Sequence, residues 1–252
     1  ERLGLRDVRV IPMSALRGDC VVDRGEGMPW YDGPTLLEHL ETVEVAGDRD
    51  LERRRFPVQW VIRPISEEHH DYRGYTGQVA GGIWHAGDAV VVLPSGRRSR
   101  VAAVETADGP LDAAVPGLSV TIRLEDDLDV GRGDLLADPA APPTVAREVD
   151  ATVCWMAEKP LDPRTRLVVK HTTRSVRALA DELVSVVDIH TLEDRPAPER
   201  LELNDIAHVR LRLAEPIAAD TFAENRATGS FILIDEATND TVGAGMIRSA
   251  AS

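Results

Sequence analysis

The sequence predicts a mainly β protein, with two consecutive small β-barrels preceded by a short α/β segment. Two features carry this prediction. Short runs of alternating apolar and polar residues recur along most of the chain, as in Val120 to Leu124, and such alternation is typical of half-buried strands. The runs are separated by turns rich in Gly, Asp and Pro, with no long helical segment among them, which is the pattern of small closed barrels.

Changes in composition divide the chain into three parts. Residues 1–53 are expected to form the α/β segment with a linker helix, and residues 54–143 and 144–252 are expected to form one barrel each. The boundary between the barrels falls in a stretch rich in Ala and Pro, Pro139 to Pro143, which is typical of an inter-domain linker.

The first part is expected to contain one strand and one helix. An apolar run predicts a short strand from Arg6 to Pro12. A helix is predicted from Thr35 to about Val43, because leucines recur there at helical spacing and Pro34 suits a first-turn position.

Turn signals place the strands of the second part. Residues 87–88 predict a tight turn before a new apolar run, and residues 93–96 predict the tip of a hairpin. The apolar residues Val58, Trp60 and Ile62 alternate with their neighbours, so we expect them to share one face of a strand.

The third part is again expected to be built from strands. Its clearest apolar runs are residues 151–155, 166–170, 209–213 and 230–234. Periodicity would also allow a helix from Val176 to Ile189. We assign strands there, because β-branched residues are frequent in this segment and the surrounding sequence is β.

Composition is that of a protein of a reducing, cytoplasmic compartment. The 252 residues are 43% hydrophobic and 29% charged, enough to bury real cores. The two cysteines, Cys20 and Cys154, stand far apart and predict neither a disulfide framework nor a metal site. No apolar stretch is long enough to span a membrane, and we expect no signal peptide. A net charge of −14 argues against binding of nucleic acid.

The sequence Ser14-Ala15-Leu16 follows the predicted first strand. Proteins of the translational GTPase type present their last guanine-reading loop with this sequence in this place. A fixed backbone N–H there accepts the six-carbonyl of guanine and rejects the amino group of adenine, and an unpaired buried donor costs about 1–3 kcal/mol. The alternative is that Ser14 only caps a helix, since Ser is a favoured cap.

Other parts of a GTP site are absent from the sequence. A phosphate-binding Gly-x-x-x-x-Gly-Lys-Ser/Thr loop is missing, as is an Asn-Lys-x-Asp sequence for the guanine ring; Lys occurs only at Lys159 and Lys170. The chain also begins at Glu1 without Met. We therefore expect a carboxy-terminal piece of a longer protein, inactive in GTP hydrolysis by itself.

A guanine loop, a linker helix and two barrels in this order resemble the later domains of elongation factor Tu and its relatives. Within that superfamily, the chain is most similar to the large GTP-binding subunit of bacterial sulfate adenylyltransferase. The similarity covers nearly the whole chain, and its clearest segments are Met28 to Leu40, Arg55 to Val61, Arg73 to Gly82, Lys170 to Arg174 and Asn225 to Asp235.

The resemblance implies a two-subunit enzyme of sulfate assimilation. A smaller, ATP-binding partner subunit would transfer the adenylyl group of ATP to sulfate, and the GTPase subunit would couple GTP hydrolysis to that uphill step. Only Ser14, Ala15 and Leu16 carry over as guanine-contacting residues; GTP phosphates and Mg²⁺ would be held by the missing amino-terminal domain. Some relatives continue into an adenylylsulfate kinase domain, of which Arg248 to Ser252 shows nothing.

Three other constellations are interpreted as surface features. Glu67 to Asp71 has metal-binding residue types, but adjacent histidines on an extended segment point to opposite sides, so an exposed loop is expected. Glu125 to Asp129 lacks the spacing of a calcium loop and is interpreted as a solvated turn, and so is Arg132-Gly133-Asp134. We expect no catalytic group and no metal ligand in this chain.

A basic stretch stands out in this acidic chain. Residues 163–180 contain no acidic residue and carry five cations: Arg164, Arg166, Lys170, Arg174 and Arg177. They form either a solvated strand face or a docking surface for the partner subunit or the GTPase domain.

Two alternative functions remain at this point. The same barrels carry aminoacyl-tRNA in translation elongation factors, although the negative charge and the segment Met28 to Leu40 argue against that role. The other alternative is a non-enzymatic interaction module that shares only the barrels.

Overall fold

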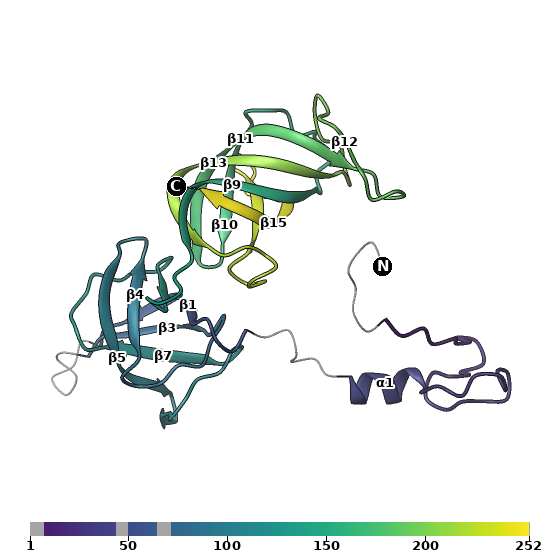
Figure 1. Cartoon of the computed structure of the whole chain (residues 1–252), viewed down its shortest axis with the longest axis horizontal. Coiled ribbons are helices and arrows are strands. Elements are labelled where there is room, and N and C mark those ends of the chain that lie inside the picture. Colours follow the sequence, from purple (N-terminus) through teal and green to yellow (C-terminus); the bar gives the residue numbers. More distant parts are fainter. Residues whose placement is uncertain (1–7, 44–49, 65–71, 252) are drawn as a thin grey trace. The chain divides into compact units, whose positions relative to one another are not determined.

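The computed structural model describes residues 8–43, 50–64 and 72–251. In that part of the chain it contains one helix, α1, and 15 strands, β1 to β15 (Figure 1). The chain divides into two compact units, Glu1–Asp48 and Arg49–Ser252. None of the described helices has the length and apolar character needed to cross a membrane.

The amino-terminal unit holds the predicted helix. Helix α1 spans Leu36–Thr42 and begins with a capping box: Glu38 N–H donates to Thr35 Oγ1 at 3.2 Å, and Thr35 N–H donates to Glu38 Oε2 at 2.8 Å. These two bonds satisfy backbone donors that a helix start otherwise leaves unpaired. The helix prediction from Thr35 to about Val43 is therefore confirmed.

The predicted strand from Arg6 to Pro12 does not form in the residues that the structure describes. Arg6 and Asp7 lie outside them, and Val8 to Pro12 has no strand structure. A strand is stabilised by a hydrogen-bonded neighbour, and no described strand pairs with this segment. The side chains of Val8 and Val10 are 69% and 80% exposed.

The first sheet of the carboxy-terminal unit contains eight antiparallel strands. They are β1 (Arg55–Pro57), β2 (Trp60–Ile62), β3 (Gly74–Gln78), β4 (Ala89–Leu93), β5 (Arg97–Thr106), β6 (Gly109–Pro110), β7 (Ser119–Leu124) and β8 (Leu135–Ala137). Their order is β1-β8-β4-β5-β7-β3-β2, with β6 beside β5. A bridge between Arg55 and Gly81 links β1 to the chain just after β3. The sheet encloses a core that includes Phe56, Tyr75, Trp84, Ile122 and Leu136.

The prediction that Val58, Trp60 and Ile62 share a face is wrong. Val58 is completely buried, whereas Trp60 is 64% exposed. The alternation breaks because the chain changes partners here: Val58 N–H donates to Asp134 O beside β8, and Gln59 N–H donates to Thr76 O on β3. The turns predicted at residues 87–88 and 93–96 are confirmed, the latter as the β4–β5 hairpin.

The second sheet contains seven antiparallel strands, drawn from teal to yellow in Figure 1. They are β9 (Thr144–Trp155), β10 (Arg166–His171), β11 (Arg174–Val187), β12 (Asp194–Pro196), β13 (Ile206–Ala219), β14 (Ser230–Asp235) and β15 (Thr241–Ala251). The order β10-β14-β15-β9-β13-β11 is closed by pairing of β11 with β10, so six strands form a barrel, and β12 lies outside it on β11.

Alternation explains why these segments form a barrel. Along most of β9 and β13, every second side chain faces a core that includes Val153, Trp155, Leu211, Phe231 and Leu233. The segment Val176 to Ile189 is strand β11 up to Val187, as predicted, and the helical alternative is excluded. The division of the chain at residues 54 and 144 stays a prediction.

Candidate functional site

The Ser14-Ala15-Leu16 segment is a single tight turn closed by its own backbone. Gly18 N–H donates to Ser14 O at 2.8 Å, and Ser14 N–H donates to Asp19 O at 3.1 Å. Ser14 Oγ accepts from Arg17 N–H at 3.3 Å, as a helix cap would. However, the first helix, α1, begins only at Leu36, so the serine organises the loop itself.

The tip of this turn presents free donors. Ala15 and Leu16 are exposed, Leu16 by 96%. Among the described residues, none accepts a hydrogen bond from the N–H of Ala15 or of Leu16. Two successive unpaired N–H groups on a fixed turn can donate to a carbonyl oxygen of a ligand. A role of Ser14, Ala15 and Leu16 in guanine binding stays a prediction.

A buried carboxylate, that of Asp19, lies directly after the turn. Asp19 is only 7% exposed, and its Oδ1 accepts a hydrogen bond from Gly27 N–H at 3.4 Å. A side chain at Gly25 or Gly27 would overlap this carboxylate as it is placed, and Gly25 also has a φ of 67°, which favours glycine. Cys20 O accepts from Leu36 N–H at 3.0 Å, which fastens the loop to the first turn of α1.

Three of the five cations of the basic stretch share one outer face of the β10–β11 pair, because Arg177 lies opposite Val168, between Arg166 and Lys170. Arg166 and Lys170 on β10, and Arg177 on β11, are exposed on the outside of the closed barrel. Arg164 stands in the turn before β10 with a φ of 65°. Arg174 is ion-paired with Glu215 at 2.8 Å.

Ion pairs therefore neutralise part of this stretch. Arg177 pairs with Glu236 at 2.7 Å. No carboxylate of the described residues forms an ion pair with Arg164, Arg166 or Lys170. Their role as a partner interface stays a prediction.

Of the other constellations, one lies outside the described residues and two lie in a connection between strands. The segment Glu67 to Asp71 lies outside the described residues. Residues 125–129 and 132–134 lie in the connection between β7 and β8, as predicted for turns. In the described part of the chain, no group of three or more His, Cys, Asp or Glu residues is arranged to hold a metal ion.

A buried ion pair joins the two sheets of the carboxy-terminal unit, and no sequence motif marks either of its members. Arg55 on β1 is 1% exposed and Asp220, just after β13, is 7% exposed. Two parallel bonds join them: Nε donates to Oδ2 and Nη2 donates to Oδ1, each at 2.8 Å. This bidentate geometry is the strongest form of an Arg–carboxylate pair.

A polar network extends from this pair into the second barrel. Thr228 Oγ1 donates to Asp220 Oδ2 at 2.6 Å, and Thr228 O lies 2.7 Å from His171 Nε2. Asn225 Oδ1 accepts from Thr228 N–H at 3.0 Å, while its Nδ2 donates to Ala80 O of the first sheet at 2.9 Å. The loop from 220 to 229 therefore bonds to both sheets.

Burial lowers the pKa of His171 below its usual value, although the hydrogen bond with Thr228 and the charge of Asp220 act in the opposite direction. Because a backbone carbonyl can only accept, Nε2 carries the proton of the neutral ring. The folded protein thus holds a neutral His171 at a pH where an exposed histidine is already charged.

We predict that His171 makes the protein less stable in acid. Its folded pKa is lowered, so its contribution is complete above the unfolded pKa of about 6.5 and is lost as pH falls from there through the folded pKa. The free energy of unfolding falls with decreasing pH by at most about 1.4 kcal/mol per pH unit through this one group. Urea unfolding of wild type and His171→Gln across this range measures it; identical pH dependence of the two would contradict the prediction.

Comparison with known proteins gives both family and fold matches. A sequence model described as GTP-eEF1A C-terminal domain-like matches residues 148–248. The chain is 49% identical over 247 residues to a protein of Mycobacterium tuberculosis named "Bifunctional enzyme CysN/CysC". The aligned region covers 98% of this chain and 40% of that protein. It is 45% identical over 245 residues to "Sulfate adenylyltransferase subunit 1" of Bacteroides fragilis, covering 97% of this chain and 50% of that protein.

The chain therefore spans two-fifths to one-half of the length of these curated relatives. Among solved structures, it resembles sup35 complexed with GMPPNP, with a TM-score of 0.72 and 21% identity. The match covers 96% of this chain and 58% of that one. The structure of the same protein complexed with GDP gives a TM-score of 0.73 at 22% sequence identity. The predicted mainly β fold class is confirmed: the second sheet is a closed six-stranded barrel, and the first curves into half a barrel without closing.

Proposed function

Because the chain belongs to the family of sulfate adenylyltransferase subunit 1, we propose that it is the carboxy-terminal part of a GTPase subunit of that enzyme. The full-length protein would couple GTP hydrolysis to the reaction of ATP with sulfate, which yields adenylyl sulfate and pyrophosphate. The observation that carries this proposal is an identity of 45–49% over nearly the entire chain.

The proposal assigns the chemistry to sites outside this chain. The 252 residues contain no Gly-x-x-x-x-Gly-Lys sequence, so the GTP phosphates and Mg²⁺ would be bound by another part of the full-length protein. ATP would be bound by the companion subunit, in keeping with the word subunit in the relatives' names. One relative is named bifunctional, which accords with a further adenylylsulfate kinase domain in some full-length chains. The composition accords with a cytoplasmic protein.

The barrels would act by contact and not by supplying catalytic groups. Adenylyl sulfate is a mixed anhydride of high energy, so its formation needs a second source of free energy. Coupling to GTP hydrolysis requires contacts that differ between the nucleotide states. The buried pair Arg55–Asp220 and the Asn225 bond join the two sheets, so a displacement of one barrel is transmitted to the other.

The Ser14 turn would read the guanine base. We predict that Ala15→Pro, which removes one of the free N–H groups while Pro remains acceptable at this position of a turn, weakens GTP binding by the full-length protein about 5- to 100-fold. Ala15→Ser keeps the N–H and serves as the control. Titration with labelled GTP measures the effect; unchanged affinity of Ala15→Pro would remove this turn from the site.

Coupled turnover tests the proposed function. The full-length protein is mixed with its candidate companion subunit, and GTP hydrolysis is followed with and without ATP plus sulfate. We expect the rate to rise only when all components are present. If ATP and sulfate leave the rate of GTP hydrolysis unchanged, and a filter-binding assay shows tight, salt-sensitive binding of aminoacyl-tRNA, the protein would instead belong to translation.

A further inference from the structure

The first residues of the carboxy-terminal unit that the structure describes are bonded to both of its sheets. Asp50 O accepts a hydrogen bond from Gly82 N–H, in the connection between β3 and β4, at 2.8 Å. Three residues later, Arg53 Nη2 donates to Glu224 O at 3.0 Å, and Glu224 lies in the connection between β13 and β14. Residues 50–53 are therefore attached to the first sheet through Asp50 and to the closed barrel through Arg53.

Every donor nitrogen of the Arg53 guanidinium has a partner. Nε donates to Asp50 Oδ2 at 2.8 Å, and Nη1 lies 3.2 Å from Glu224 Oε1. The other carboxylate oxygen of Glu224 accepts from the N–H and from the hydroxyl of Thr221, at 3.1 and 2.8 Å. A planar guanidinium presents its donors in a fixed fork, so it can hold two partners in a defined geometry. Arg53 thus fixes Asp50 relative to the loop from 220 to 229.

Close packing at the same junction leaves no space for slack. Gly81 lies against both bonded segments, because an added Cβ there would come within 2.7 Å of Arg53 O and 2.9 Å of Asn225 Nδ2. Asn225 Nδ2 itself donates to Ala80 O at 2.9 Å. Tightly packed atoms transmit a displacement to their neighbours. The direction in which residues 50–53 leave the junction is therefore set by both sheets together.

The bonds of Arg53 can open while the two sheets stay joined. The side chains of Arg53 and Glu224 are 35% and 48% exposed, whereas those of Arg55 and Asp220 are 2% and 6% exposed. Water can replace the partners of an exposed pair, but loss of a buried partner leaves an uncompensated charge. A cavity of about 210 Å³, lined in part by Arg53, Glu224 and Pro142, gives the guanidinium room to move. The Arg55–Asp220 pair is thus permanent, and the Arg53 contact is reversible.

Resting on the proposed function, we propose that Arg53 is a positioning residue for the coupling of GTP hydrolysis. Its bonds to Asp50 and Glu224, here called the Arg53 latch, hold the segment through which the amino-terminal unit is covalently connected to the sheets. With the latch closed, this segment leaves the junction in a fixed direction, so a displacement that arrives along the chain moves both sheets. With the latch open, the segment bends at residues 50–53 and absorbs the displacement.

Coupled turnover of full-length variants with the companion subunit tests the proposal. Arg210→Ala is the matched control for Arg53→Ala, since Arg210 is 42% exposed and also pairs with two carboxylates, both within the closed barrel. We expect Arg53→Ala to lower the stimulation of GTP hydrolysis by ATP plus sulfate about fivefold or more, with the basal rate and the KM for GTP unchanged. Arg210→Ala should keep the stimulation of the wild type. Arg53→Ala combined with Glu224→Ala should be no worse than Arg53→Ala alone, because both changes break one contact.

Amide hydrogen exchange tests the latch without any coupled reaction. The N–H groups of Glu52 and Arg53 both donate to Asp50 Oδ1 at 3.0 Å, and Arg53 holds that carboxylate in place. Arg53→Ala should therefore speed exchange in peptides that cover residues 50–54 and 221–229, and Arg210→Ala should not. Arg53→Lys keeps the charge but lacks the fork, so it should show both effects at smaller size. It replaces Arg53→Ala if thermal melts show that the alanine variant is unfolded.

The outcomes separate the latch from the proposed function. Wild-type stimulation in Arg53→Ala would overturn the positioning role, whether or not exchange is faster. An equal loss of stimulation in Arg210→Ala would also overturn it, since any lost ion pair would then have the same effect. If GTP hydrolysis by the wild type is indifferent to ATP and sulfate, the proposed function is overturned together with the role in coupling. Faster exchange in Arg53→Ala would then still confirm the contact itself.

Discussion

Asp220→Ala is expected to lower the free energy of unfolding of the carboxy-terminal unit by about 3–5 kcal/mol. The substitution leaves the guanidinium of Arg55 buried at 1% exposure without its counter-charge. It also removes the acceptor of the Thr228 hydroxyl. Urea unfolding followed by tryptophan fluorescence measures the loss, because Trp84 lies in the core of the first sheet and Trp155 in that of the second.

Two controls distinguish loss of a buried charge partner from loss of any ion pair. Asp181→Ala breaks a pair with Arg212, whose side chain is 57% exposed, and should cost less than about 1 kcal/mol. Replacing both buried partners, as in Arg55→Met with Asp220→Leu, should cost less than Asp220→Ala alone, since no unpaired charge remains. If Asp220→Ala costs no more than Asp181→Ala, the pair does not hold the barrels together.

Local patterns were sufficient for most strands of the second barrel. In β13, for example, residues facing the core alternate with residues facing water over most of the strand, and this is a property of neighbouring residues. The same reasoning failed at Val58 and Trp60, because the chain passes there from one partner strand to another. Which strand accepts each N–H depends on the whole sheet and is not written in the segment itself.

The candidate site shows the same limit. The turn at Ser14 could be located because a short motif follows an apolar run. The Arg55–Asp220 pair could not, since 165 residues separate its members and neither has a distinctive neighbourhood. The basic stretch was visible in the sequence, but its ion pairs were not. Arg174 pairs with Glu215 and Arg177 pairs with Glu236, and only the folding of the barrel brings these residues close.

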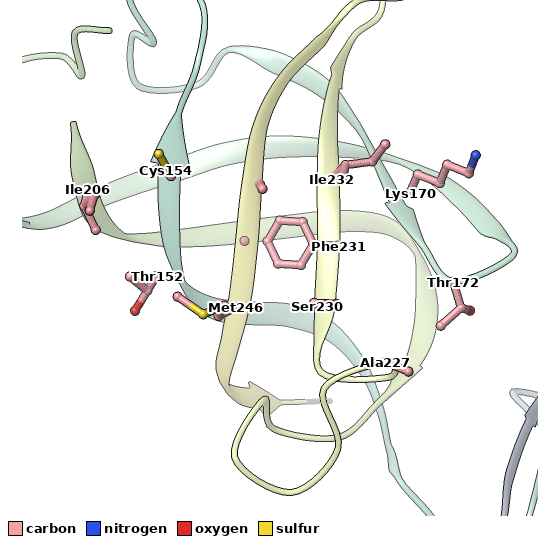
Figure 2. A pocket seen from close by; sticks show the side chains of 12 residues that line it. Thr152, Cys154, Lys170, Thr172, Ile206, Ala227, Ser230, Phe231, Ile232 and Met246 are labelled. Atoms are coloured by element: carbon pink, nitrogen blue, oxygen red, sulfur yellow. The ribbon is translucent and has the colours of Figure 1, made fainter. Parts of the chain in front are cut away.

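Phe231→Ala is the second substitution with a large expected effect, about 3–5 kcal/mol of stability. Phe231 is 4% exposed and lies directly opposite Gly245 in the β14–β15 pair. Its ring fills the space that a side chain on Gly245 would need, since an added Cβ would overlap the ring. Removal of the ring (Figure 2) leaves a cavity in the core of the second sheet, and urea unfolding measures its cost.

The reciprocal substitution tests the same contact from the other strand. Gly245→Ala should destabilise by about 1–3 kcal/mol through overpacking, whereas Gly131→Ala should be nearly neutral, because nothing lies within 4 Å of the added Cβ. Gly245→Ala combined with Phe231→Leu should cost less than the sum of the two single changes, because the smaller side chain makes room. Strict additivity would mean that the cost of Gly245→Ala does not come from contact with the Phe231 ring. A coupled result would show that the ring needs a glycine opposite it in the β14–β15 pair.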